Sequence, residues 1–217
     1  MSSEVIEAWT NGCSDKEATT SKENNNYVAV TSSKNDEDYL FDPSLLSDID
    51  LTTSQAEFNP KLSVTNPGDC LKLRPLQQGD YRRGFLQLLG QLTTVGEICE
   101  EKWNQRFNQM KRHSGIFHVM VLEDTLTKKV VGATTLVVEP KFIHECGQVG
   151  RVEDVVVCSE YRGRQLGKFL VAVSVLLAAK LDCYKVTLNC KDNMIKFYNG
   201  MGFKCEDGDA NFMVIRI

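Results

Sequence analysis

Hydrophobic and polar residues alternate with two different periods along the chain after residue 66. An alternating or β-branched pattern, typical of strands, occurs at residues 71–74, 117–123, 130–139, 150–157, 184–189 and 211–217. A period of three to four residues, typical of helices, occurs at residues 80–89, 98–112, 166–177 and 192–199, with Asp80 as the expected N-cap of the first. With one further strand before residue 211, the order predicts β-α-α-β-β-β-α-β-α-β-β, a single α+β (mixed α/β) domain.

The longest apolar segment of the chain follows a run of three valines. Val155–Val157 is β-branched and uninterrupted, which is typical of a strand buried on both faces. The apolar residues of the next segment share one helix face: Leu166, Phe169, Leu170, Val173 and Leu177. A strand–helix–strand crossover then predicts that residues 184–189 run parallel to the valine strand.

The junction between this strand and this helix has the composition of an anion site. Arg162–Gly167 (RGRQLG) combines glycines and two arginines with a helix start, where backbone N–H groups lack partners and the dipole is positive. We therefore expect a phosphate or pyrophosphate here. Three residues separate Gly163 from Gly167 and Phe169 follows Lys168, which excludes a nucleotide P-loop, and the three-glycine dinucleotide pattern is absent. The alternative is an ordinary glycine turn before a core helix.

Acidic residues are concentrated in the N-terminal part of the chain. Residues 1–60 carry twelve Asp or Glu and three Lys, a balance of −9, so the rest carries +5 within the net charge of −4. We expect residues 1–66 to be an acidic, largely disordered extension and residues 67–217 to be the folded domain. An apolar patch within residues 39–50 is expected to dock, on the domain or on a partner. The small, scattered basic excess of the domain suits an anionic ligand but not nucleic acid.

The sequence carries no pattern of export, membrane insertion or metal binding. The first ten residues lack the apolar core of a signal peptide, and no apolar run is long enough for a membrane span. The eight cysteines form no C-x-x-C pair, and the three histidines are not near paired cysteines. We therefore expect reduced thiols, no metal and a cytoplasmic protein, and peripheral association with endomembranes stays open.

The strand and loop at residues 155–167 resemble the acetyl-CoA site of the GNAT superfamily of N-acetyltransferases. That loop reads [Arg/Gln]-x-x-Gly-x-[Gly/Ala]; Arg162 and Gly167 match its ends, and Gln165 replaces its central glycine. Longer segments are similar to the animal branch of the glucosamine 6-phosphate N-acetyltransferase family: FDPSLL, LRPL, LGQLTTVG, KFIHECGQVGRVEDVVV, YRGRQLGKFL, LDCYKVTLNC and KFYNGMGF. The resemblance covers about residue 40 to the end of the chain.

This resemblance implies a fold, a reaction and an assembly. The fold is that of the GNAT acyl-CoA N-acyltransferases, with a mostly antiparallel sheet that contains a splayed parallel strand pair. Acetyl-CoA is the implied cosubstrate, without a metal, and D-glucosamine 6-phosphate is the implied acceptor. The product would be N-acetyl-D-glucosamine 6-phosphate, within UDP-N-acetylglucosamine biosynthesis, and the protein would be a homodimer.

The ligand residues of the family carry over onto matching positions of this chain. Its coenzyme contacts correspond to Glu153, Asp154, Val155, Arg162, Gly163, Arg164, Gln165, Leu166, Gly167, Asn193 and Tyr198. Its sugar-phosphate contacts correspond to Thr93, Lys141, Phe142, Ile143, His144, Glu153, Asp154, Val155, Tyr184, Lys185, Asn189 and Arg216. Asn189 departs from the acidic residue of the family, so an acceptor atom is kept while the negative charge is lost.

The expected chemistry is direct attack of the amine on the thioester in a ternary complex. Glu153 or Asp154 would orient or deprotonate the amine, and a backbone N–H near Val155 would support the oxyanion. Tyr198 would donate a proton to the departing thiolate. Two alternatives remain: an acetyltransferase acting on a protein or polyamine amine, and a CoA-binding module without turnover.

Overall fold

The computed structural model describes residues 38–205 and Ile215. Its strands are β1 (Leu71–Pro75), β2 (Phe117–Asp124), β3 (Val130–Pro140), β4 (Gln148–Val157) and β5 (Cys183–Leu188). Its α-helices are α1 (Ser44–Ser47), α2 (Phe85–Leu89), α3 (Glu100–Lys111), α4 (Ile143–Cys146), α5 (Leu166–Lys180) and α6 (Ile195–Asn199). Short 3₁₀ helices are η1 (Leu51–Thr53), η2 (Gln78–Tyr81), η3 (Ser159–Tyr161) and η4 (Asp192–Met194).

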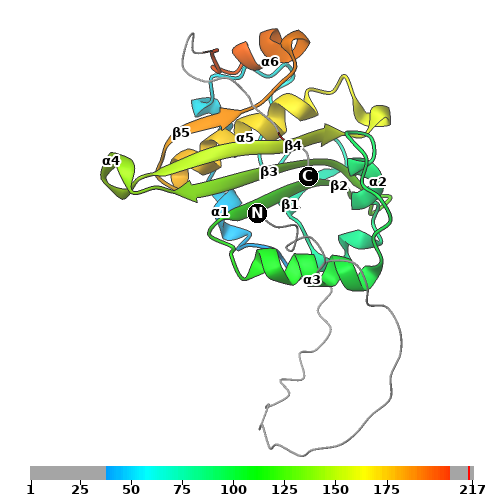
Figure 1. Cartoon of the computed structure of the whole chain (residues 1–217). Coiled ribbons are helices and arrows are strands. Elements are labelled where there is room, and N and C mark those ends of the chain that lie inside the picture. The colour runs from blue at the N-terminus through cyan, green and yellow to red at the C-terminus, as the bar shows by residue number, and fades with distance from the viewer. Residues whose placement is uncertain (1–37, 206–214, 216–217) are drawn as a thin grey trace, which may run out of the picture. The chain divides into compact units, whose positions relative to one another are not determined.

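The five strands form one mixed sheet in the order β1-β2-β3-β4-β5 (Figure 1). Neighbouring strands are antiparallel, except for β4 and β5, which are parallel and joined by α5. The predicted α+β fold with a parallel strand pair is therefore confirmed. The predicted strand at 211–217 and the strand before it fall almost entirely outside the described residues.

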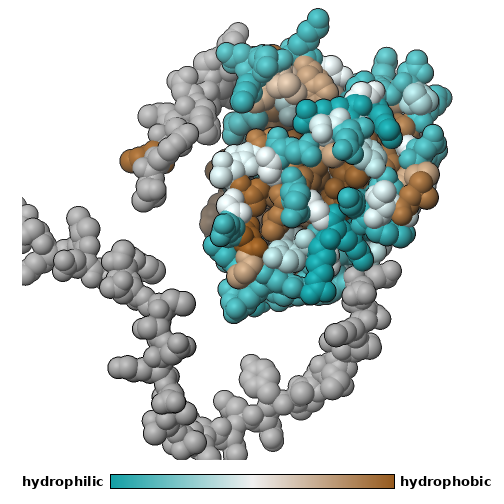
Figure 2. Space-filling view, turned by 90° about the vertical axis from the view of Figure 1, so that its right-hand side faces the viewer, coloured by the Kyte–Doolittle hydropathy of each residue, from teal (hydrophilic) through white to brown (hydrophobic). Residues whose placement is uncertain are grey.

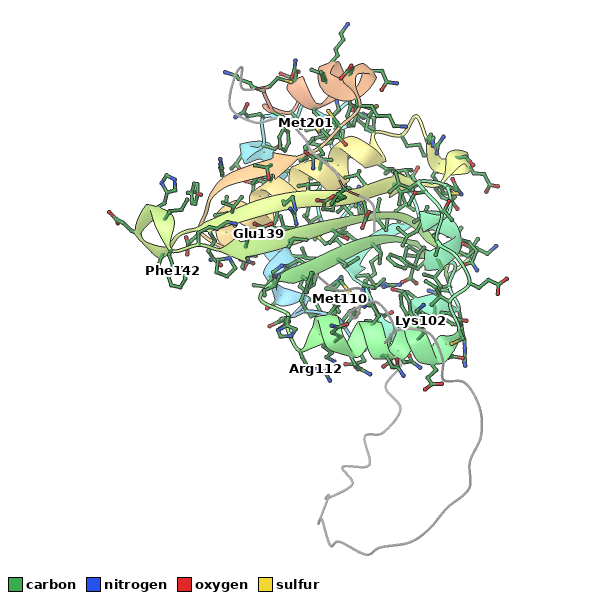
Figure 3. The ribbon with its side chains drawn as sticks, in the orientation of Figure 1. Lys102, Met110, Arg112, Glu139, Phe142 and Met201 are labelled. Carbon is green, nitrogen blue, oxygen red and sulfur yellow. The ribbon has the colours of Figure 1, made fainter. Side chains whose placement is uncertain are left out.

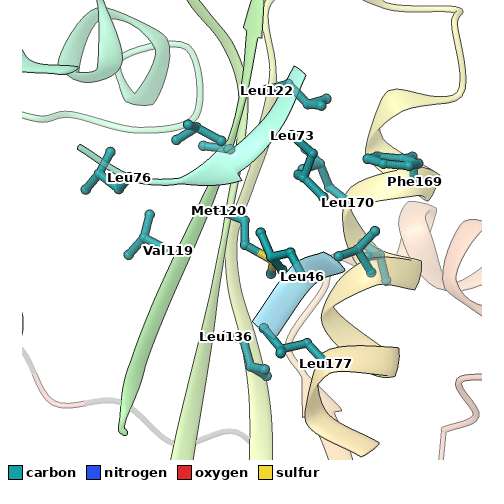
Figure 4. Close-up of a cluster of buried hydrophobic side chains, with 14 of the residues drawn as sticks. Leu46, Leu73, Leu76, Val119, Met120, Leu122, Leu136, Phe169, Leu170 and Leu177 are labelled. Carbon is teal, nitrogen blue, oxygen red and sulfur yellow. The ribbon is translucent and has the colours of Figure 1, made fainter. Parts of the chain in front are cut away.

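Helix α5 packs on one face of the sheet because nearly all of its side chains are apolar. Phe169, Leu170 and Leu177 are fully buried against β2 and β3 residues (Figure 4). Two glycines permit this close packing. A Cβ on Gly150 of β4 would lie 3.0 Å from Ala178 Cβ, and one on Gly132 of β3 would lie 3.3 Å from Leu170 Cδ1.

Helices α2 and α3 belong to the other face of the sheet. The apolar residues of α3 recur at helical spacing, and Trp103 and Phe107 are buried. The indole Nε1 of Trp103 donates to the carbonyl of Gln78 at 2.7 Å, which fixes α3 against η2. This arrangement leaves the rest of α3 free to face the end of the sheet that carries the candidate site.

The prediction that Asp80 is the N-cap of a helix running to residue 89 is wrong. Asp80 lies inside η2, fully buried, and its carboxylate pairs with the buried guanidinium of Arg74 at 2.8 Å. A separate helix, α2, begins only at Phe85, after Gly84 adopts a φ of +87°. The buried ion pair outweighs helix continuity here because an uncompensated buried carboxylate would be very costly.

The N-terminal segment of the described chain packs on the α5 side of the sheet. Leu40, Phe41 and Leu46 are buried in the common core, and the N–H of Leu40 donates to the carbonyl of Leu76. The packed segment continues through η1, where Leu51 is buried, to about residue 59. Residues 39–59 are therefore an integral layer of the domain.

No helix among the described residues is long and apolar enough to cross a membrane.

Candidate active site

A β-bulge in β4 stands at the centre of the candidate site. Glu153 pairs with Thr135 of β3 and Val156 pairs with Ala133, so Asp154 and Val155 together face the single residue between them. Asp154 has a φ of +53°, in the left-handed region that a residue with a side chain adopts at a cost. The bulge bends the strand and directs the backbone of these two residues out of the regular ladder.

Strands β4 and β5 are paired over only part of their length. Their pairing runs to Val152 and Leu188, whereas β4 continues beside β3 as far as Val157. The edge of β4 from Glu153 to Val157 therefore has no β5 partner, and its backbone groups face a gap next to the bulge. A linear ligand entering this gap would find hydrogen-bonding groups of the kind that an adjacent strand normally occupies.

The loop between β4 and α5 has the geometry of an anion site. Gly163 and Gln165 both have positive φ angles, of +80° and +62°. The N–H of Phe169 makes the first helical hydrogen bond, to the carbonyl of Gln165 at 2.9 Å, so the N–H groups of residues 166–168 precede the hydrogen-bonded part of α5. Arg162 and Arg164 are exposed beside them. This combination of free N–H groups, positive dipole end and arginines suits a pyrophosphate.

Neighbouring elements hold this loop from two sides. The hydroxyl of Tyr161 donates to the carboxylate of Asp124, and this hydrogen bond lowers the pKa of Asp124 below its ordinary value. From the end of α2, the Gln91 carboxamide accepts from the N–H of Ser159 at 2.9 Å. The guanidinium of Arg164 lies over the Tyr161 ring, 5.1 Å from its centroid. The loop is therefore built in advance of any ligand.

A groove of about 700 Å³ opens between α3 and the sheet and reaches the bulge. Asp154 and Thr135 lie at its sheet side, and Trp103 and Phe107 form part of its apolar wall. Figure 2 shows the side of the protein that lies on the right of Figure 1, where hydrophilic side chains surround a more hydrophobic middle. The groove is large enough for a small phosphorylated sugar beside the bulge.

Cationic residues on and just after α3 line this groove, and no local motif in the sequence identifies them. Lys102, Arg106 and Arg112 are exposed, and within residues 38–205 none of them lies in an ion pair. Figure 3 shows Lys102 and Arg112 toward the two ends of α3, with Met110 between the helix and the sheet. Their spacing along an otherwise amphipathic helix was the available signal, but solvated charges on a surface helix give the same pattern.

A chain of ion pairs leads along β3 and β4 to Glu153. Lys141 Nζ lies 2.6 Å from Glu139, whose other oxygen lies 3.1 Å from Arg151, and Arg151 Nε lies 3.0 Å from Glu153. The Lys141 hydrogen bond, together with the charges of Arg151 and Lys141, lowers the pKa of Glu139. By strand register, Lys185 of β5 shares the sheet face of Val149, next to these residues. Lys141, Glu153 and Lys185, which are predicted to contact the amino sugar, thus lie on one face of the sheet.

The β3–β4 hairpin ends in an exposed, apolar tip (Figure 3). Phe142 is 97% exposed and Ile143 is 63% exposed, while the rings of His144 and Tyr184 stack with centroids 4.2 Å apart. His144 and the two residues after it all have φ between +51° and +62°. Such a run of left-handed residues is costly and is typical of functional sites rather than of ordinary turns.

A second cavity, of about 750 Å³, lies between the end of β5 and α6. Lys185, Asn189 and Tyr198 line it. Burial is the main cause of the raised pKa of Tyr198, whose hydroxyl carries its proton at neutral pH even at the ordinary pKa of a tyrosine. Among the residues that the structure describes, none lines both this cavity and the groove at Asp154.

Two further predicted ligand residues line neither of these two cavities. Thr93 is exposed between α2 and α3, and Asn193 is exposed on η4. Arg216 lies outside the described residues. The roles assigned to all the predicted site residues stay predictions.

A mixed sheet with a partly separated parallel strand pair, a bulge at the separation and an anion loop at the next helix start define an acyl-CoA-dependent N-acyltransferase. The model of the acetyltransferase (GNAT) family matches residues 80–203 of the chain. A Drosophila melanogaster protein described as a probable glucosamine 6-phosphate N-acetyltransferase is 50% identical over 182 residues, which cover 83% of each chain. The glucosamine 6-phosphate N-acetyltransferase of Arabidopsis thaliana is 36% identical over 134 residues, 62% of this chain and 90% of the relative.

Solved structures give the same result. The crystal structure of glucosamine-6-phosphate N-acetyltransferase from Arabidopsis thaliana superposes with a TM-score of 0.62 at 34% identity, covering 66% of this chain and 97% of that one. A Trypanosoma brucei acetyltransferase superposes with a TM-score of 0.60 at 31% identity, covering 66% and 99%. The chain belongs to the GNAT family, among its glucosamine 6-phosphate N-acetyltransferases.

Proposed function

We infer that this protein transfers the acetyl group of acetyl-CoA to the amine of D-glucosamine 6-phosphate. The products are N-acetyl-D-glucosamine 6-phosphate and CoA, and the reaction supplies UDP-N-acetylglucosamine biosynthesis. The observation that carries this inference is the bulge at Asp154, because it joins the β4–β5 gap to the α3 groove. The gap suits an acyl thioester, the groove suits a small charged acceptor, and relatives at up to 50% identity carry this activity in their names.

The coenzyme is proposed to lie along the open edge of β4. Its pyrophosphate would bind the loop at the start of α5, through Arg162 to Gly167, and its acetyl end would reach Val155 at the bulge. Asn193 and Tyr198 would complete this half of the site from η4 and α6. The fit rests on the free N–H groups of the loop and on the unpaired strand edge described above.

The amino sugar is proposed to occupy the groove on the α3 side of the bulge. Glu153 and Asp154 would face its amine. Its phosphate and hydroxyls would contact mainly cationic and aromatic residues, of which those that the structure describes lie outside the lining of this groove: Thr93, Lys141, Phe142, Ile143, His144, Tyr184, Lys185, Asn189 and Arg216. Lys102 and Arg106 of α3 add positive charge to the same groove, which favours a phosphorylated acceptor over a neutral one.

The chemical step needs one proton removed and one supplied. The amine nitrogen forms a bond to the carbonyl carbon while the carbon–sulfur bond breaks. Glu153 or Asp154 takes the proton from the amine, directly or through water, and the N–H of Val155 stabilises the charge on the carbonyl oxygen. Tyr198, whose phenol carries its proton at neutral pH, gives a proton to the thiolate.

We also propose that the protein is a cytoplasmic homodimer. The exposed apolar side chains of Phe142 and Ile143 at the hairpin tip suit contact with a second copy. All seven cysteines within the described residues are free thiols, in keeping with a reducing compartment. Light scattering would test the dimer, and a monomeric mass at micromolar concentration would contradict it.

A thiol-release assay with acetyl-CoA tests the proposed activity. Glucosamine 6-phosphate is compared with unphosphorylated glucosamine and with a lysine peptide. We expect release with the phosphorylated sugar to exceed both others by at least about a hundredfold, since a cationic site that lacks its phosphate loses several strong interactions. Preference for the peptide would identify a protein acetyltransferase, and CoA binding without release for any acceptor would identify a binding module.

A further inference from the structure

Residues 55–59, which we call the strap, lie against the loop at the start of α5. The N–H of Asn59 donates to Gln165 Oε1 at 3.2 Å, and Gln165 Nε2 donates to the carbonyl of Asn59 at 2.6 Å. The carboxamide of Gln165 thus pairs with the backbone of Asn59 as one peptide group pairs with another across a strand ladder. A segment far away in the sequence thereby holds the residue just before α5.

This contact explains a glutamine at a position that favours glycine. Gln165 has a φ of +62°, a conformation that glycine adopts more easily than any residue with a side chain. The two hydrogen bonds to Asn59 offset that cost, and they do so only while the strap is in place. The carbonyl of Gln165 also accepts the first hydrogen bond of α5, so its position sets the direction of the free N–H groups that follow.

The strap also makes contacts on either side of this pair. Lys168 Nζ donates to the carbonyl of Glu57 at 2.8 Å and lies 5.6 Å from the centroid of the Phe58 ring. At the other side, a Cβ on Gly202 would overlap the carboxamide of Gln55, so the strap packs closely on the turn after α6. The strap therefore touches both elements proposed to bind the coenzyme, the start of α5 and the end of α6.

We propose that the strap is a positioning element for the coenzyme, acting through Gln165 to orient the pyrophosphate-binding N–H groups. The proposal rests on the proposed function, since it concerns the same acetyl-CoA site. The strap contributes no group to the chemical step. Its loss therefore weakens coenzyme binding and leaves both turnover at saturation and amino-sugar binding unchanged.

Two substitutions at Gln165 test this directly. Gln165→Leu keeps the approximate size of the side chain and removes both hydrogen bonds, and Gln165→Gly removes them while relieving the cost of the positive φ. We expect each to raise the KM for acetyl-CoA and the calorimetric Kd for CoA by about three- to tenfold, as for the loss of one to two modest hydrogen bonds. The kcat and the KM for glucosamine 6-phosphate should stay within about twofold of the native values.

A double-mutant cycle separates positioning by the strap from direct contact between Gln165 and the coenzyme. Phe58→Ala weakens the strap without changing Gln165 or its hydrogen bonds to Asn59, and we expect it alone to raise the Kd for CoA. Combined with Gln165→Leu, its effect should be less than additive, because both changes disrupt one contact. Lys180→Met is the matched control: Lys180 binds the carbonyl of Leu45 at 3.1 Å, at the far end of α5, so its loss should leave the Kd unchanged.

The outcomes distinguish a failure of the strap proposal from a failure of the proposed acetyltransferase function. If the native protein binds no CoA, the proposed function fails. If it binds CoA and Gln165→Gly binds as tightly or more tightly, the strap has no positioning role. Full additivity of Phe58→Ala and Gln165→Leu would also overturn the proposal, since the two residues would then act separately.

Discussion

His118 shows how one buried residue makes the stability of the protein depend on pH. Its ring is 1% exposed and packs edge-on against Phe41, with centroids 5.0 Å apart. Burial lowers the pKa of His118 to about 4, from an ordinary value of 6.5. Between about pH 6.5 and pH 4 the imidazole is therefore neutral in the folded chain, whereas the unfolded chain binds a proton there.

We expect the free energy of unfolding to fall by about 2 kcal/mol between pH 7 and pH 5 from this residue alone. The sign follows from the lowered pKa: between about pH 6.5 and pH 4 the unfolded state binds the proton and the folded state does not, so acidification favours unfolding. Urea unfolding at both pH values measures this loss. In His118→Gln the pH dependence should shrink by the same amount, and an unchanged pH dependence would mean that His118 protonates in place.

The carboxylates at the bulge carry the proposed proton transfer from the amine. We expect Glu153→Gln or Asp154→Asn to lower kcat by about a hundredfold or more, the usual contribution of a general base. Both substitutions keep the shape of the side chain, so unfolding midpoints should stay near the native value. Steady-state kinetics with saturating acetyl-CoA would measure kcat for both variants. A loss in kcat of less than threefold in both would be incompatible with a role in proton transfer.

Tyr198 carries the proposed proton donation to the thiolate. Tyr198→Phe keeps the ring that packs 6.0 Å from Phe203 and removes only the hydroxyl. We expect kcat to fall about tenfold or more while the melting temperature stays near that of the native protein. If turnover were unchanged, the leaving thiolate would take its proton from another source.

At the scale of elements, close packing of α5 on β4 depends on small residues. Gly150→Val should cost about 1–3 kcal/mol of stability, because its Cβ alone would lie 3.0 Å from Ala178 Cβ and 3.2 Å from Leu136 Cδ1. Gly79→Ala is the control, since no heavy atom lies within 4 Å of a Cβ placed there. Chemical denaturation of both variants would measure the difference, and equal stabilities would show that α5 shifts freely.

Most elements could be predicted from the sequence, because each has a clear period over enough residues. The valine-rich β4 and the apolar α5 are examples, and the parallel orientation of β5 followed from the strand–helix–strand crossover. The break between η2 and α2 was missed because the buried pair of Arg74 and Asp80 is a tertiary interaction without a local pattern. The bulge was missed for a similar reason. Asp154 adopts a left-handed backbone conformation that a glycine would have signalled in the sequence, but the residue there is an aspartate.

At the scale of the whole molecule, the N-terminal segment and the sheet share one core. Leu40 has no exposed surface, so Leu40→Ala should cost about 2–5 kcal/mol, the range for buried leucines. Leu126, which is 76% exposed, gives the contrasting case, and Leu126→Ala should cost less than about 0.5 kcal/mol. Urea unfolding followed by fluorescence and by circular dichroism should show one transition for Leu40→Ala; a separate early transition would place the segment outside the cooperative unit.

The candidate site was predictable where a resemblance or a local motif identified it, as at Arg162–Gly167 and Glu153. The contribution of α3 was not, because exposed cations such as Lys102 have the same pattern on any surface helix. The strap was not predictable either. Asn59 and Glu57 act through backbone atoms, and backbone atoms leave no trace in an amino-acid sequence.

The separation of 106 residues between Asn59 and Gln165 affects the order in which the chain folds. At a synthesis rate of about 5–20 residues per second, Asn59 is made at least about five seconds before Gln165. The strap therefore waits for the loop at the start of α5, and closing so long a segment is entropically slow. Coenzyme binding is thus expected to mature last, after the sheet and α5 are already in place, and a chain that ends before residue 165 would lack α5, β5 and a competent site.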